Sequence, residues 1–158
     1  MFSFFNSLIV LLAILRVKVF GTGLLIYLPW ASVGFFIEMY FELILNPVLI
    51  NIWGVIGWCL FGLLTGLSAD LSYWYLRKKT SLKEKYTASI TAMIMSLVFF
   101  ILNVIASIYF YKNGMTNLNF SPSTFLGNAY FGIPWMIINS LFGGYVAYNL
   151  NKDLTKNS

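Results

Sequence analysis

The apolar run from Gly23 to Pro47 is the sequence feature that most limits how this chain can fold. It contains no basic residue and is long enough to cross a bilayer, because about 20 apolar residues span the hydrocarbon core. Of the whole chain, 59% is hydrophobic and 9% is charged, whereas a soluble domain averages roughly 25% charged residues. The sequence therefore predicts an integral membrane protein.

We expect an all-α fold, a polytopic transmembrane helical bundle that forms a single domain over residues 1–158. The first apolar run is interpreted as a helix because Arg16 and Lys18 follow it, whereas a secretory signal peptide carries its positive charge before the apolar run. Pro29 and Pro134 predict kinks, since proline removes a backbone hydrogen bond. The five predicted spans are about residues 2–20, 23–45, 48–76, 86–111 and 125–150.

The distribution of basic residues predicts the orientation of these spans, because Lys and Arg favour the cytoplasmic side of short loops. Two basic residues follow the first span, none the second, five the third and one the fourth, and two lie in the C-terminal tail. This alternation predicts a multi-pass protein of the cell membrane with its N-terminus outside and its C-terminus in the cytoplasm.

Two carboxylates, Glu38 and Glu42, lie inside the apolar run and, being four residues apart, share one helix face. In the predicted orientation they lie in the outer half of their helix. A charged side chain at the centre of a membrane helix costs on the order of 2.5–3.5 kcal/mol, and it normally marks a pathway or a site. No Lys or Arg is predicted at membrane depth, so a purely structural ion pair is disfavoured. We expect the pair to contact amides, aromatic side chains or a ligand.

Amide and aromatic residues of other helices are predicted at similar depth. Ligand sites combine apolar and aromatic walls with a few polar groups, and aromatic faces beside carboxylates suit a flat heteroaromatic or cationic molecule. Each aromatic residue alone is more often a membrane-interface residue. The candidate substrate-binding residues are Glu38, Glu42, Asn46, Trp53, Asn103, Asn128, Tyr130 and Trp135.

Small residues on the third and fifth helices predict close helix contact, either within the bundle or with a partner. Gly62 and Gly66 are four residues apart, and Gly143 and Gly144 are adjacent. Asp70 follows the first pair near the end of its helix. We expect Asp70 to pair with Arg77 or with a lysine of the following loop, or to serve as a structural carboxylate at an interface. These five residues are the candidates for partner docking.

Catalysis and cofactor binding have little support in the sequence. The chain has no histidine, which removes the commonest general base and metal ligand, and its one cysteine, Cys59, lies within an apolar helix. It contains no HExxH, P-loop or GxSxG motif. The basic residues cluster at predicted helix ends and are interpreted as topology signals, not as a nucleic-acid surface. We therefore expect no enzyme activity, no metal, no cofactor and no binding of ATP by this chain alone.

Three stretches, taken in order, carry a resemblance to a known family. They are Glu42 ahead of the Asn46-Pro47 break, the glycine-rich GLLTGLSADLSYWYLRKK from Gly62 to Lys79, and the closing SLFGGYVAYNLNKDL. In this order, and in size and composition, the chain resembles the substrate-binding (S) subunits of energy-coupling factor vitamin transporters, and within them the thiamine/hydroxymethylpyrimidine permease type.

The resemblance implies a subunit that captures a vitamin or a precursor outside the cell and topples in the membrane to release it. It also implies a partner transmembrane (T) subunit and two ATPase subunits, which supply the energy. Such subunits usually have six helices and five are predicted here, so the resemblance implies that the first of the six is missing, either because the start is truncated or because a divergent member has lost a helix. The alternative is a non-catalytic helical subunit of a larger membrane complex, which would explain the glycine faces but not the two outer-half carboxylates.

Overall fold

The computed structural model describes residues 2–45, 52–112 and 122–156, which hold five helices joined in part by short connections and contain no strand. Each predicted span contains one helix, so the prediction of an all-α chain with five helices is confirmed. The boundaries lie within six residues of those predicted, and the predicted start of the third span, at residue 48, lies outside the described residues. The helices are α1 (Phe2–Val17), α2 (Thr22–Leu45), α3 (Ile52–Lys79), α4 (Glu84–Lys112) and α5 (Pro122–Lys156).

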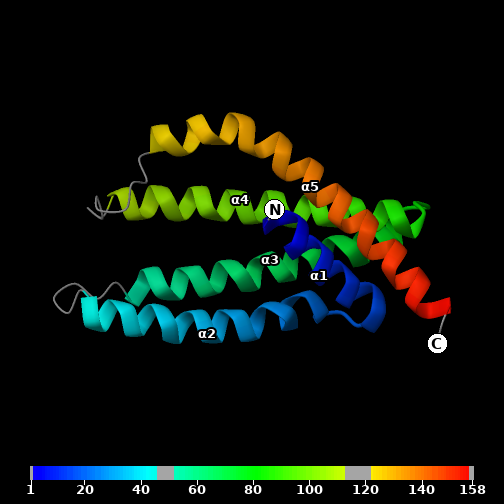
Figure 1. The fold of residues 1–158 in the computed structure, drawn as a ribbon, viewed down its shortest axis with the longest axis horizontal. Coiled ribbons are helices and arrows are strands. Elements are labelled where there is room, and N and C mark those ends of the chain that lie inside the picture. Colours follow the sequence, from blue (N-terminus) through cyan, green and yellow to red (C-terminus); the bar gives the residue numbers. More distant parts are fainter. Residues whose placement is uncertain (1, 46–51, 113–121, 157–158) are drawn as a thin grey trace.

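The helices form two antiparallel pairs with a shorter helix against one end of them (Figure 1). α3 packs against α2 and α4, while α5 packs against α4 and α1. α1 also contacts α2, whereas no contact joins α2 to α5 among the described residues. α1 ends, α2 begins, α3 ends, α4 begins and α5 ends on the same side of the molecule (right in Figure 1). We call this side the basic end, because most of the Lys and Arg residues belong to it, and we call the opposite side the far end.

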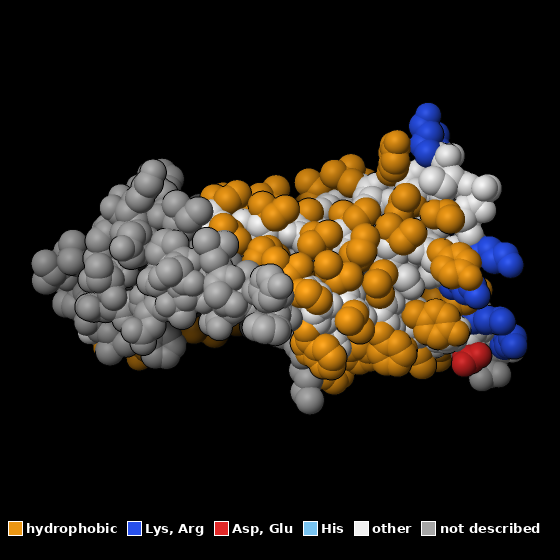
Figure 2. Space-filling model, turned by 90° about the horizontal axis from the view of Figure 1, so that it is seen from above, with side chains coloured by type: hydrophobic (Ala, Val, Ile, Leu, Met, Phe, Trp, Pro, Cys, Tyr) orange, Lys and Arg blue, Asp and Glu red, His pale blue; other side chains and the backbone are white. Residues whose placement is uncertain are grey.

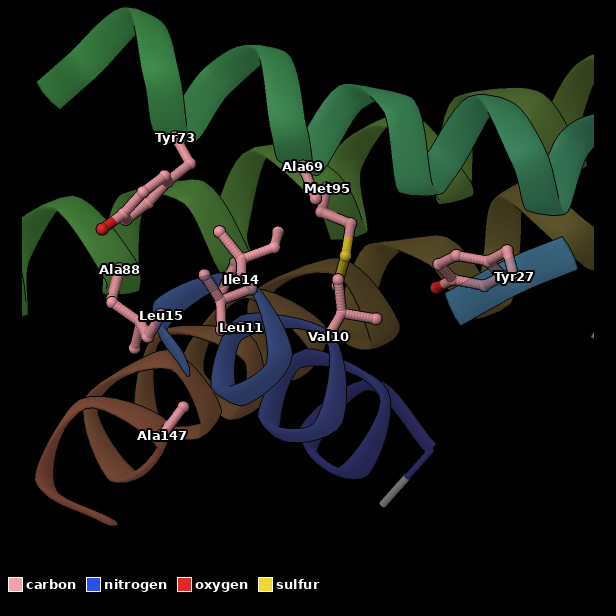
Figure 3. Close-up of a cluster of buried hydrophobic side chains, with 11 residues drawn as sticks. Val10, Leu11, Ile14, Leu15, Tyr27, Ala69, Tyr73, Ala88, Met95 and Ala147 are labelled. Carbon is pink, nitrogen blue, oxygen red and sulfur yellow. The ribbon is translucent and has the colours of Figure 1, made fainter. Parts of the chain in front are cut away.

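α1 supplies much of the buried core. Val10, Leu11, Ile14 and Leu15 follow the spacing of one helical stripe, and all four are completely buried. Figure 3 shows these side chains against residues of the neighbouring helices, among them Tyr73. With 16 residues against 24 to 35 in the other helices, α1 covers only the basic-end half of the bundle, since a helix rises about 1.5 Å per residue.

Both internal prolines lie inside continuous helices. α2 runs without a break through Pro29, and α5 runs through Pro134. α5 changes direction in the part that contains Pro134 (orange in Figure 1), as the sequence predicts.

One stretch of the described residues, Glu84–Leu102 in α4, is long and apolar enough to cross a membrane. Two shorter apolar stretches lie in the first two helices, at Phe4–Val17 and Thr22–Val33. The structure thus establishes five helices and, among the described residues, one candidate membrane span.

Candidate functional site

The predicted ligand-site positions fall at the far end of the bundle, beyond the start of α1. Tyr27 of α2 contacts Asn6 of α1, and Gly143 of α5 lies against Phe4, so both helices pass the start of α1 at these points. The backbone positions of the candidates on the two pairs of helices lie further along, at Glu38, Glu42, Trp53, Asn103, Asn128, Tyr130 and Trp135.

Seven of the eight candidate side chains are outside the part of the chain that the structure describes. Asn46 falls in the interval between α2 and α3, and the other six have described backbones only. Which of these side chains meet therefore stays a prediction. The exception is Trp135, whose side chain is 64% exposed, so the described residues do not enclose it. Any ring that stacks on Trp135 would have to approach from outside the described core.

Gly66 marks the closest approach between α2 and α3. A Cβ atom at Gly66 would overlap the carbonyl oxygen of Gly23 and would lie 2.7 Å from Cδ2 of Tyr27. A Cβ at Gly62 would meet only Cδ1 of Tyr27, at 3.5 Å, which is an ordinary contact. Gly66 is therefore required for the contact between the backbones, whereas Gly62 is not.

Gly143 and Gly144 make two more close contacts, on different sides of α5. A Cβ at Gly143 would lie 2.8 Å from the carbonyl oxygen of Phe4 in α1, and a Cβ at Gly144 would lie 2.7 Å from that of Ala88 in α4. Of the two roles that the sequence allows for these glycines, close packing within the bundle is the one observed. Docking of a partner at Gly62, Gly66, Gly143 and Gly144 stays a prediction, and three of the four are buried inside the chain.

Asp70 is completely buried and binds the first turn of α2. Its Oδ1 accepts the backbone N–H of Gly23 at 3.0 Å, and its Oδ2 accepts that of Leu24 at 3.0 Å. The first N–H groups of a helix have no partner within the helix, and its N-terminus favours negative charge. The prediction that Asp70 pairs with Arg77 or a loop lysine is therefore wrong, because the partners of this buried carboxylate are backbone N–H groups of α2 and not a basic side chain. Its structural role is confirmed, and docking of a partner at this buried group stays a prediction.

Three side-chain hydrogen bonds between elements were not anticipated from the sequence. Tyr27 donates its hydroxyl to Oδ1 of Asn6 at 2.7 Å, joining α2 to α1. Tyr73 donates to Oε1 of Glu84 at 3.1 Å, joining α3 to the start of α4. Ser140 of α5 donates to the hydroxyl of Ser96 in α4 at 2.6 Å. A polar residue at an inward position of an apolar helix is the only sequence signal for such bonds, and it does not identify the partner.

Positive charge is concentrated at one end of the bundle. Figure 2 shows Lys and Arg side chains at that end, while hydrophobic side chains cover most of the described part of the face in view. Nine of the ten basic residues belong to the helix ends and connections there, which gives the basic end its name. They are Arg16, Lys18, Arg77, Lys78, Lys79, Lys83, Lys85, Lys152 and Lys156. The tenth, Lys112, ends α4 on the opposite side.

Comparison with known proteins gives no relative from which a role could be transferred. No family model, no curated protein and no solved structure matches the chain. Within the described residues, no three His, Cys, Asp or Glu side chains come together as they would around a metal ion.

Proposed function

We propose that this chain is a polytopic membrane protein that binds a small molecule at the far end of its bundle. The observation that carries the proposal is the placement of Glu38 and Glu42. Both lie on α2, at the end opposite nine of the ten basic residues. Two acidic residues four apart on an apolar helix, away from the basic end, favour a ligand that is cationic or rich in N–H donors.

The surface supports membrane placement for more than the one candidate span. Large hydrophobic side chains are exposed along all five helices, including Phe5 on α1, Phe36 on α2, Leu60 on α3, Ile101 on α4 and Phe142 on α5. Soluble monomers rarely expose contiguous apolar patches of this kind, whereas a bilayer covers them. The basic end then faces the cytoplasm, because Lys and Arg accumulate on that side. α1 then points outward from the cytoplasmic side and begins midway along the bundle, and Glu38 and Glu42 lie in the outer half.

The finer proposal is that the chain is the substrate-binding subunit of an energy-coupling factor transporter for a vitamin or a precursor. A thiamine-like or hydroxymethylpyrimidine-like compound fits the site chemistry, because it combines an aromatic ring with amine donors or positive charge. The predicted carboxylates would bind the donors, and a tryptophan such as Trp53 or Trp135 would stack on the ring. The partners are then a transmembrane subunit and two ATPase subunits.

Cysteine labelling in intact cells tests the orientation. With Cys59 replaced by alanine, Lys79→Cys should be shielded from an impermeant thiol reagent, because the connection between α3 and α4 faces the cytoplasm. Asn117→Cys, on the opposite side of the sequence-predicted topology, should be labelled. Labelling after membrane permeabilisation is the control for reactivity. The reverse pattern in intact cells would overturn the orientation and place the two glutamates in the inner half.

Ligand binding tests the site. Purified protein is titrated with thiamine and with its aminopyrimidine fragment, and tryptophan fluorescence is followed. Glu38→Gln or Glu42→Gln should weaken binding by about 1.5–3 kcal/mol, the range for a hydrogen bond to a charged group. The matched control is Asp153→Asn, which changes an exposed carboxylate at the basic end and should bind as wild type does.

If neither compound binds wild type, the ligand assignment fails. If both glutamine variants bind as tightly as wild type, the carboxylates are not the site, and the alternative of a non-catalytic subunit is favoured.

A further inference from the structure

The basic end is more than a concentration of positive charge. Eight of its nine basic side chains are exposed, and the ninth, Lys85, is partly exposed. The carboxylates available nearby are few in the described part of the chain. Asp70 is buried with both oxygens bound to backbone N–H groups, which leaves Glu84 and the exposed Asp153. Most of these cations therefore have no carboxylate of the described chain with which to pair.

Exposed apolar side chains alternate with these cations where α1 leads into α2. Between α1 and α2, the chain reads Arg16, Val17, Lys18, Val19 and Phe20, and the three apolar residues are 53–59% exposed. Lys18 has a φ of 56°, in the left-handed region, so the chain reverses sharply within this stretch. A stretch that projects into water would not present exposed apolar groups beside both of its cations.

The same combination recurs on the other two segments of the basic end. Leu82 is 43% exposed in the connection between α3 and α4, one residue before Lys83. On the last turns of α5, Leu154 is 51% exposed between Lys152 and Lys156. All three segments thus present positive charge together with apolar surface, which complements the anionic headgroups and adjacent acyl chains of a lipid layer.

Aromatic side chains complete this surface. Tyr75 and Tyr86 are 64% and 51% exposed, on α3 and α4 respectively. Nζ of Lys85 lies 4.8 Å from the centre of the Tyr86 ring, and the guanidinium carbon of Arg77 lies 5.8 Å from the centre of the Trp74 ring. Aromatic rings at the membrane interface, with cations beside them, hold a protein at headgroup depth.

We propose that the basic end is a binding surface for anionic phospholipid headgroups, with the two connections lying in the headgroup layer. The occupant is the lipid phosphate, because it offers negative charge and adjacent acyl chains together. An acidic face of another protein would match the cations without requiring Val17, Val19, Phe20 and Leu82 to be exposed. The inference rests on the membrane placement proposed above and is independent of the substrate.

Retention of lipid during purification tests this inference. The full chain is reconstituted in phosphatidylcholine with about one quarter phosphatidylglycerol and then extracted gently, and bound lipids are counted by native mass spectrometry. Each basic residue near an anionic surface contributes roughly a fivefold factor in affinity. The triple change Lys78→Gln, Lys79→Gln and Lys83→Gln should therefore lower the preference for phosphatidylglycerol by about tenfold or more. These three lysines are exposed, and the hydrogen bonds that Lys83 accepts from Tyr86 and Thr87 use its backbone carbonyl, which glutamine keeps.

Replacing the same three lysines by arginine is the matched control, because it keeps the charge and should keep the preference. Melting temperatures in phosphatidylcholine alone should be equal for all three proteins, which separates loss of lipid binding from loss of folding. Retention of the two lipids by wild type in the proportion in which the membrane holds them would overturn the inference, as would unchanged retention by the glutamine variant. Flotation of wild type with the vesicles tests membrane placement separately, so failure of that premise is distinguishable from failure of the lipid surface.

Discussion

Asp70→Ala should destabilise the bundle more than any other single change considered for this chain. The substitution removes both acceptors of the Gly23 and Leu24 N–H groups and leaves these groups unpaired at the buried start of α2. A hydrogen bond to a charged group contributes about 1.5–3 kcal/mol, so the loss of two should lower the free energy of unfolding by about 3 kcal/mol or more. Thermal unfolding of the purified protein in detergent measures the effect.

Two further variants make the test specific. Asp70→Asn keeps one acceptor oxygen but turns an amide donor towards the second N–H, so its melting temperature should lie between those of wild type and Asp70→Ala. Asp153→Ala removes an exposed carboxylate at the same end and should leave the melting temperature unchanged. If Asp70→Ala melted with wild type, the proposed role of Asp70 in holding the first turn of α2 would be wrong.

Gly66→Ala should also be strongly destabilising, although it adds only one methyl group. That methyl would overlap the Gly23 carbonyl oxygen and approach Tyr27 at 2.7 Å. The obstacle at Gly23 is backbone, so α2 and α3 would have to move apart, which would also disturb the bonds to Asp70. Overpacking of a tight core typically costs about 1–3 kcal/mol, and this contact belongs at the upper end of that range.

Gly62→Ala, four residues earlier on the same helix, is the matched control. Its methyl group would meet only the Tyr27 ring at an ordinary 3.5 Å, while alanine is favoured over glycine in a helix interior by up to about 1 kcal/mol. Gly62→Ala should therefore melt at or above the wild-type temperature, whereas Gly66→Ala should melt well below it. Equal responses of the two variants would show that the close approach at Gly66 is not what limits this interface.

These two glycines show how far sequence reasoning reaches. The spacing of Gly62 and Gly66 predicts a face on which another helix can approach closely, and that prediction is correct for the α2–α3 contact. It treats the two glycines alike, however, because the pattern does not specify where along α3 the other backbone comes nearest. That point depends on how α2 is positioned along α3, which the sequence pattern leaves open.

Asp70 illustrates a different limit. Its partners are backbone N–H groups, which every residue except proline carries, so no side chain identifies them in the sequence. The sequence at the start of α2 does contain a clue that an outside acceptor is needed. Of Gly21, Thr22 and Gly23, only Thr22 has a side chain that commonly caps a helix N-terminus. The hydroxyl of Thr22 donates to the carbonyl oxygen of Val19, so the first turn needs an acceptor from elsewhere.

The five helices themselves could be predicted well, because long apolar runs leave the backbone few ways to satisfy its hydrogen bonds other than a helix. The candidate site could be predicted only to the level of helices and depth. Glu38 and Glu42 share a face of α2 by their spacing alone. Whether that face meets Asn103 or Trp53 depends on the rotation of each helix about its axis, and the titration of the glutamine variants tests the outcome directly.

The bond from Asp70 to Gly23 also orders events during synthesis. The two residues are 47 positions apart, so the start of α2 leaves the ribosome long before the carboxylate that completes it. Until α3 has been made and lies beside it, the first turn of α2 lacks two of its hydrogen bonds. We therefore expect α2 and α3 to be completed together, as an antiparallel pair, and not one after the other.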